Sequence, residues 1–536
     1  MNAMRELTCQ IKDYIQPFER QLALQELQAL TAGTPIPVGA GPDEAVRFRV
    51  KTDVALIKLK THLAYWQTVG TNKQEITYQL RSEATSLVAR NGVDLQDIPR
   101  VVPQIVDTKL PNKRCLRYAT HGLHEYRGKF FPQLVRALMN MARVSPNGIV
   151  IDPMCGSGTT LVEAALSGRQ TFGLDMNPLS VFVTQIKCQV LGINPKVIIT
   201  SFNRLSKNLQ MPISKLNGSN YFGTLPEVDQ DYLKRWYAVS VLEELDHIER
   251  AIQKQTPSAV RNFYRLCLSN VLRAVSWQKE DDLRVRKEVR IFDRGEVIAR
   301  FLEEARRSAK TVAAFSTLRG GRGLGKYSVQ EADARDAANV LRQVGGEVDA
   351  VITSPPYATA LPYLDTDRLS LIYLGLLSRA DHRSRDTLMI GNREVTERTR
   401  TVYWNTYVKD CRLLPEDTRA LIERIDRLNS GGTVGFRRRN LSALLSKYFF
   451  DMREVIMQQF ELLRSGGVMF MVIGNNRTTA GGEEIEIQTT AHLAKIAESI
   501  GFRLAGNLSM EMLTSRDIFR KNAMPSEQIL TLQKDQ

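Results

Sequence analysis

The sequence predicts an α/β protein built on a doubly wound, Rossmann-like sheet, with a helical N-terminal region and helical insertions. From residue 148, short β-branched runs alternate with a helical period, in the order GIVIDP, TTLVEAALSG and QTFGLDM. Two further strand-like runs, VDAVITSPPY and GGVMFMVIGNN, begin at residues 348 and 466. Strands that alternate with helices in this way are typical of a parallel sheet covered by helices on both faces.

The strand and helix patterns divide the chain into a core in three parts and several additional regions. Two runs near the C-terminus, FRLAGNLSME and EQILTLQK, predict a terminal antiparallel pair. Residues 201–325 show a helical pattern, and residues 380–445 carry many charges, including Arg437, Arg438 and Arg439. Long insertions between the elements of a rigid sheet are common places for function. The three predicted core parts are residues 111–200, 326–379 and 446–536.

Residues 1–110 are predicted to form a mostly helical accessory region. Apolar side chains from Ile11 to Leu30 recur at helical spacing, and a Gly- and Pro-rich stretch, TAGTPIPVGAGPDE, begins at Thr31. The next run, VRFRVKTDVALIKLKTHLAYWQTVG, mixes short alternation with aromatic and basic residues, and its pattern favours neither strands nor a helix.

The composition indicates a globular protein with a polyanionic partner. Lysine and arginine number 73 against 58 aspartate and glutamate residues, a formal net charge of +15. Basic side chains that face phosphates release condensed counterions, so the charge favours a polyanionic partner such as nucleic acid; a solvated basic surface is the alternative. The six cysteines contain no C-x-x-C pair, which argues against a zinc knuckle and a disulfide framework. We expect no metal site, no membrane span, a charged N-terminus unlike a secretory signal, and a cytoplasmic location.

The first motif of chemical interest, DPMCGSGTT, runs from Asp152 to Thr160. It joins a strand to a helix through a turn in which Gly156 and Gly158 allow backbone amides to approach a ligand closely. The motif lacks the Lys-Ser/Thr of a phosphate-binding Walker loop and departs from the G-x-G-x-x-G fingerprint. The next strand ends at Asp175, about 20 residues further on, where a carboxylate can accept hydrogen bonds from ribose hydroxyls. Taken alone, a plain tight turn and a helix cap would explain these residues; their spacing favours an adenosine-containing ligand.

The second motif is Ser354-Pro355-Pro356-Tyr357, at the end of an apolar strand. Two prolines remove two backbone donors and fix the turn, which leaves carbonyl oxygens free to accept hydrogen bonds. An exocyclic amino group needs acceptors for both of its hydrogens before it becomes nucleophilic, and the Ser354 hydroxyl and the Pro355 carbonyl can supply them. Tyr357 could then stack on a base that has left its helix. In isolation the tetrapeptide would be no more than a turn.

Together these motifs resemble the amino-methyltransferases that modify cytosine or adenine in DNA, which carry an [S/N/D]-P-P-Y tetrapeptide. The resemblance covers roughly residues 118–200 and 327–510. It implies the class I methyltransferase fold and S-adenosylmethionine as cofactor, with HGLHEYRGKFFP from His121 enclosing the methionine part and the acidic pair of EADARD near the adenine. The implied cofactor-binding residues are Tyr126, Lys129, Phe130, Asp152, Met154, Cys155, Gly156, Ser157, Gly158, Thr159, Thr160, Asp175, Asp333 and Asp336.

The resemblance also implies double-stranded DNA as substrate, a flipped target base and a companion restriction endonuclease or other defence protein. Serine rather than aspartate in the tetrapeptide favours N4 of cytosine over N6 of adenine. Because serine and aspartate can each activate an amine, adenine stays open. Direct in-line transfer needs no covalent intermediate, and the sequence contains no Pro-Cys dipeptide of the kind used by ring-carbon methyltransferases. Two other functions stay open: an RNA guanine amino-methyltransferase, and a DNA-binding subunit without catalytic activity.

Overall fold

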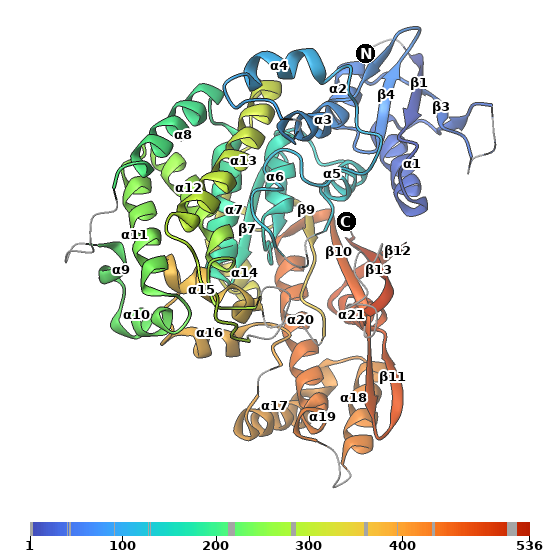
Figure 1. Ribbon diagram of the computed structural model, residues 1–536. Coiled ribbons are helices and arrows are strands. Elements are labelled where there is room, and N and C mark those ends of the chain that lie inside the picture. Colours follow the sequence, from blue (N-terminus) through green and yellow to red (C-terminus); the bar gives the residue numbers. More distant parts are fainter. Residues whose placement is uncertain are drawn as a thin grey trace.

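The structure is a computed structural model (Figure 1). It describes residues 4–39, 41, 44–90, 92–126, 128, 130–212, 220–279, 286–358, 363–393, 395–430, 435–511 and 523–535.

A central sheet of eight strands, counted within the described residues, organises the chain in the order β12-β13-β10-β9-β6-β7-β8, with β11 paired to β10. Strands β8, β7, β6, β9 and β10 are parallel, whereas β13 runs antiparallel between β10 and β12. This is the sheet of a class I methyltransferase, and it confirms the predicted fold class and the terminal antiparallel pair. The strands are β6 (Ile149–Asp152), β7 (Gln170–Asp175), β8 (Tyr327–Glu331), β9 (Val348–Thr353), β10 (Leu463–Ala480), β11 (Glu483–Ile487), β12 (Phe502–Glu511) and β13 (Ala523–Lys534).

Successive residues of the central strands face two different hydrophobic cores. Val351 of β9 packs into a core with helices α20 and α21, while Ala350 and Ile352 pack into a core with helix α5. Side chains alternate between the two faces of a strand, so a run without polar residues, such as AVI in β9, indicates burial on both sides. The helices that cover the sheet are α5 (Pro132–Met141), α6 (Thr159–Leu166), α7 (Pro178–Leu191), α14 (Ala337–Val340), α20 (Leu441–Leu462) and α21 (Thr489–Ile500).

The N-terminal region contains, beside its helices, an antiparallel sheet in the order β2-β3-β1-β4-β5 that the helical expectation for residues 1–110 did not include. In β1, Leu7, Cys9 and Ile11 are buried at every second position, so the first apolar residues follow the period of a strand and not that of a helix. This region packs against α5 through α1. Its elements are β1 (Arg5–Ile11), α1 (Pro17–Thr31), β2 (Ile36–Pro37), β3 (Arg47–Thr52), α2 (Leu56–His62), β4 (Trp66–Gly70), β5 (Gln74–Ile76), α3 (Tyr78–Arg90) and α4 (Ile98–Ile105).

Two helical lobes flank the carboxyl edge of the parallel strands (Figure 1). The larger lobe lies between β7 and β8 and shares a core with α3, α4 and α7. The smaller lobe, from α17 (Glu397–Asp410) to α19 (Phe436–Arg439), lies beside the β10–β11 hairpin, whereas α15 (Tyr363–Tyr373) shares the core of the larger lobe. None of the described helices is both long and apolar enough to cross a bilayer. The helices of the larger lobe are α8 (Pro195–Leu209), α9 (Tyr221–Thr224), α10 (Glu227–Lys234), α11 (Val239–Gln253), α12 (Ser258–Leu272) and α13 (Glu296–Arg319); those after β9 are α15 (Tyr363–Tyr373), α16 (His382–Leu388), α17 (Glu397–Asp410), α18 (Glu416–Asn429) and α19 (Phe436–Arg439).

Candidate cofactor pocket and catalytic turn

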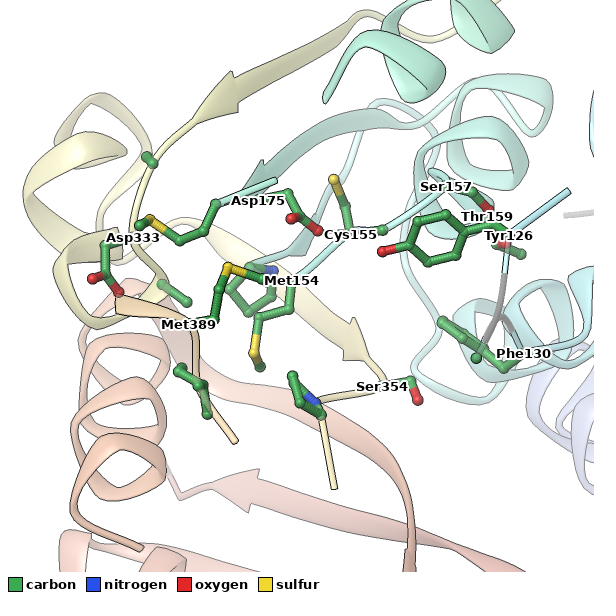
Figure 2. A pocket seen from close by; sticks show the side chains of 18 residues that line it. Tyr126, Phe130, Met154, Cys155, Ser157, Thr159, Asp175, Asp333, Ser354 and Met389 are labelled. Carbon is green, nitrogen blue, oxygen red and sulfur yellow. Dashed lines mark hydrogen bonds between the residues drawn. The ribbon is translucent and has the colours of Figure 1, made fainter. Parts of the chain in front are cut away.

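A cavity of about 770 Å³, open to solvent, lies where the strands β6 to β9 end. Figure 2 shows Asp333 and Tyr126 at opposite ends of this cavity, with Asp175 and Ser354 on opposite sides of it. The sequence-predicted residues that line it are Tyr126, Phe130, Met154, Cys155, Gly156, Ser157, Thr159, Asp175, Asp333, Ser354 and Pro356. Asp152, Gly158, Thr160, Asp336, Pro355 and Tyr357 lie outside its wall, and Lys129 lies outside the described residues.

The cavity wall also includes residues that the sequence interpretation missed. Met176 directly follows Asp175, so a longer reading of the same strand end would have found it. Met389 and Ile390 come from the segment after α16, for which the sequence offers no comparable signal. The other missed wall residues are Gly128, Pro153, Ala332 and Ala334.

The glycine loop between β6 and α6 adopts a backbone that only glycine accepts readily. Gly156 has φ +49° and Gly158 has φ +76°, both in the left-handed region. A Cβ at Gly156 would lie 2.9 Å from Cε1 of Tyr126, so the tyrosine ring packs directly on the loop. The Tyr126 hydroxyl lies 3.0 Å from the Ser180 hydroxyl of α7, which fixes the ring at one end of the cavity.

Side chains of α7 hold the loop from outside. Thr184 donates a hydrogen bond to the Gly156 carbonyl at 2.9 Å, and the buried Lys187 donates to the Ser157 carbonyl at 3.0 Å. Because these carbonyls are already bound, the loop keeps one shape at the N-terminus of α6, a position that favours a polar or anionic ligand. This arrangement suits the carboxylate-bearing end of an amino-acid-containing cofactor.

Asp175 connects the end of β7 to the loop. Its two carboxylate oxygens accept hydrogen bonds from the backbone amides of Gly156 and Asn177, each at 2.8 Å. Burial raises the pKa of Asp175 from 3.8 to about 6. A carboxylate at a cavity wall can accept further hydrogen bonds from ribose hydroxyls, and it does so most strongly when ionised.

We therefore expect the affinity for S-adenosylmethionine to fall as the pH is lowered through 6. Because the folded-state pKa of Asp175 is raised, the carboxyl is ionised above pH 6 and protonated below it. Between pH 7.5 and pH 5 the dissociation constant should rise about tenfold. Calorimetric titration of the cofactor across this range measures the effect. An Asp175→Asn variant should bind weakly with little pH dependence; a variant that keeps the wild-type pH profile would assign the effect to another group.

Two predicted cofactor residues support the loop from behind. Asp152 is 1% exposed, and its carboxylate accepts a hydrogen bond from the Met154 amide at 3.2 Å. Burial raises the pKa of Asp152 to about 7. The Thr160 hydroxyl donates to the Ile352 carbonyl at 3.1 Å and joins α6 to β9. These residues shape the turn and do not form the cavity surface.

Asp333 lies at the end of the cavity near β8, where Arg335 binds it. The Arg335 guanidinium donates to both Asp333 carboxylate oxygens, at 3.0 Å and 2.6 Å, and also to Asp451 and to the Leu388 carbonyl. Ionic pairing with Arg335 lowers the pKa of Asp333 against the effect of burial. Asp336 lies beyond the wall, where it accepts a hydrogen bond from Asn339. Of the predicted acidic pair, the structure brings Asp333 alone to the cavity.

The segment after α16 closes the same end of the cavity. Arg385 donates to the Met176 carbonyl at 2.8 Å and pairs with Glu331 of β8 at 2.5 Å. These contacts, with the Arg335 bond to Leu388, attach α16 to the carboxyl ends of β7 and β8. Met389 and Ile390 thereby provide an apolar wall next to Asp333, which suits an adenine ring.

The catalytic turn lies beside the glycine loop because β6 and β9 are parallel neighbours. The register pairs Ile151 with Val351, so the two strands end side by side. Ser354 and Pro356 reach the cavity, and the Tyr448 hydroxyl of α20 donates to the Pro356 carbonyl at 3.0 Å. The hydrogen bond from Tyr448 therefore fixes the catalytic turn to helix α20.

A buried network anchors α6, the helix that follows the glycine loop. Glu163 is fully buried; its carboxylate accepts hydrogen bonds from the Tyr118 hydroxyl at 2.7 Å and from Arg136 at 2.7 Å, and lies 2.8 Å from His121 Nε2. The Arg136 guanidinium lowers the pKa of Glu163 to about 2 despite burial. His124 Nε2 lies 3.1 Å from the Ser269 hydroxyl. Both histidines of the HGLHEYRGKFFP segment therefore have structural partners.

Known proteins match the chain at this site and beyond it. A model described as RMKL-like, methyltransferase domain, matches residues 123–213, which include β6, the glycine loop and β7. The type II methyltransferase M.AvaI of Nostoc sp. is 24% identical over 439 residues, 74% of this chain and 84% of that protein. M.BsoBI of Geobacillus stearothermophilus, also a type II methyltransferase, is 22% identical over 466 residues, 74% of this chain and 83% of that protein. The chain is thus similar to type II methyltransferases over 74% of its length. Its cofactor is S-adenosylmethionine.

A shorter match involves an RNA-modifying enzyme. A tRNA (guanine(10)-N2)-dimethyltransferase of Methanocaldococcus jannaschii is 39% identical over 71 residues, which is 13% of this chain and 20% of that protein. The sequence identity of this match is higher, but the match covers a short segment, whereas the two type II methyltransferases align with most of this chain.

Proposed function

We propose that this DNA methyltransferase transfers a methyl group from S-adenosylmethionine to the exocyclic amino group of a flipped base in double-stranded DNA, with N4 of cytosine as the target. The observation that carries the proposal is one shared cavity: Ser354 and Pro356 of the catalytic turn line the same space as the glycine loop and Asp175. A methyl donor and an amine held in one cavity can react without a carrier.

The residues divide the chemistry between them. The cofactor supplies an electrophilic methyl group on a sulfonium whose departure leaves a neutral thioether. The Ser354 hydroxyl and the Pro355 carbonyl accept the two N–H hydrogens and so direct the nitrogen lone pair toward the methyl carbon. The N–C bond forms as the C–S bond breaks, and the nitrogen then loses one proton to solvent. Tyr357 packs on the base.

The choice of base rests on Ser354, a neutral residue where related tetrapeptides can carry a charged aspartate. N6 of adenine has the same two hydrogens and is the alternative. The local similarity to a tRNA methyltransferase supports an RNA guanine target less than the longer alignments support DNA. A subunit without activity is disfavoured by the complete tetrapeptide and glycine loop. We further propose a cytoplasmic role in restriction-modification or phage defence with a companion protein, and DNA contacts from both helical lobes.

Replacing Ser354 by alanine is expected to lower the methylation rate about 100-fold, because one acceptor for the amine is lost. The purified protein and the variant are incubated with tritiated S-adenosylmethionine and unmethylated duplex DNA, and the DNA is digested to nucleosides and chromatographed. Cofactor affinity should stay within about threefold of wild type. Ser499→Ala, on α21 and outside the cavity wall, is the matched control.

The position of the label decides between the candidates. Label in N4-methylcytosine supports the proposal, and label in N6-methyladenine keeps the mechanism but changes the base. Label in RNA and none in DNA would overturn the DNA assignment. A wild-type protein that binds the cofactor and labels neither polymer would favour the subunit without activity.

A further inference from the structure

Tyr357 is held by two neighbouring strands as well as by its own turn. Gly474 of β10 and Glu527 of β13 are opposite each other in the antiparallel register. A Cβ at Gly474 would lie 3.4 Å from Cζ of Tyr357, an ordinary contact distance, so the ring packs directly against this position of β10. The Tyr357 hydroxyl donates a hydrogen bond to Oε1 of Glu527. The tyrosine ring thus packs against Gly474, and its hydroxyl is hydrogen-bonded to Glu527.

The position of Glu527 is unusual for a carboxylate. It lies in a strand between β10 and β12, and its cross-strand neighbours are Gly474 and Met510, neither of which carries a positive charge. Burial raises the pKa of Glu527, and the hydrogen bond from Tyr357 opposes that effect. Glu527 is partly buried. A desolvated acceptor is costly unless it is hydrogen-bonded, and the Tyr357 hydroxyl supplies such a bond.

We propose that Glu527 is a positioning residue for the methyl transfer, and that it acts through the Tyr357 hydroxyl; this inference rests on the function proposed above. A tyrosine that packs on a flipped base must present one ring face at a fixed angle. Anchoring the hydroxyl removes ring orientations that would leave the base misaligned with the methyl carbon, and small misalignments are costly in such reactions. A phenol that donates to a carboxylate is also more electron-rich, which favours the positive charge that develops on the amine.

A double-mutant cycle tests the inference. Tyr357→Phe and Glu527→Leu should each lower kcat about tenfold, because each removes the same hydrogen bond to a charged group. The double variant should also lose about tenfold, not about hundredfold, since the two residues act through one contact. KM for DNA and the cofactor affinity should change less than about threefold. Glu527→Gln retains an acceptor oxygen and should restore kcat to within about threefold of wild type. Glu498→Leu, an exposed carboxylate on α21, is the control.

The other outcomes are distinguishable. Additive losses near hundredfold, or a Glu527→Leu variant with wild-type kcat, would overturn the inference and leave the proposed function standing. If Glu527→Leu does not fold, the cycle is run with Glu527→Gln; a tenfold loss from Glu527→Gln alone, or a further tenfold loss when it is added to Tyr357→Phe, would then contradict the inference. Wild-type protein that labels no nucleic acid would overturn the proposed function itself.

Discussion

Replacing Gly158 by alanine is expected to weaken the binding of S-adenosylmethionine at least about 100-fold. The new Cβ would lie 2.5 Å from Cγ2, 2.6 Å from Oγ1 and 2.9 Å from Cβ of Thr184. Rotating the threonine side chain cannot move its Cβ, so the loop itself must shift, and overpacking of this kind costs about 1–3 kcal/mol. The left-handed φ of +76° adds about 1–2 kcal/mol of strain. Calorimetric titration of the cofactor measures the loss.

Gly168 offers a matched control for the strain alone. Its φ is +77°, and a Cβ there would meet nothing within 4 Å. Gly168→Ala should therefore lower stability by about 1–2 kcal/mol and bind the cofactor as the wild type does. Equal cofactor affinities for the two alanine variants would show that the contact between the loop and Thr184 is not what shapes the pocket.

Replacing Glu163 by leucine should destabilise the protein by about 3–5 kcal/mol. The substitution leaves Arg136, 2% exposed, as a buried cation without its counter-charge, and removes the acceptor of Tyr118. Urea unfolding followed by circular dichroism gives the change in free energy. The double variant Glu163→Leu/Arg136→Met should recover most of the loss, because no uncompensated charge remains. A loss below about 1 kcal/mol in the single variant would contradict this account.

The same pair predicts how stability depends on acid. The pKa of Glu163 is about 2 in the folded protein and 4.5 ordinarily, so the carboxylate contributes stability above pH 4.5 and loses that contribution as the pH falls toward 2. The Glu163→Leu/Arg136→Met variant should show a shallower loss of stability across this window.

The order of strands and helices could be predicted wherever one local pattern dominated. The apolar runs before Ser354 and after Gly466 were predicted to be buried strands. Both faces of the sheet are covered, so these strands carry uninterrupted apolar residues. The N-terminal sheet was missed because Ile11 ends a strand of period two and lies only six positions before a helix that begins at Pro17, so one window contained both periods. Which strands pair, as β1 does with β3, depends on residues that are far apart in the sequence. A local pattern therefore cannot show the pairing.

The candidate site was predictable where its residues lie within one motif. Asp152 to Thr160 and Ser354 to Tyr357 are contiguous, and the parallel pairing of β6 with β9 follows from the fold class. Residues that reach the site from other segments were not predictable. Met389 depends on how a long insertion folds back, and Glu527 depends on which strand lies next to β10. The positions of both residues depend on the tertiary structure, and no sequence motif marks them.

The pairing of Ile151 with Val351 also bears on how the chain folds. About 200 residues separate these partners, and closing so long a segment is entropically costly and slow. The intervening residues include helices α8 to α13, whose buried side chains, such as Leu245, Phe263 and Val312, belong to one core. Contacts between successive helices are local and form quickly. We therefore expect the larger lobe to assemble first and to shorten the distance that the two central strands must close, which makes the methyl-transfer site a late product of folding.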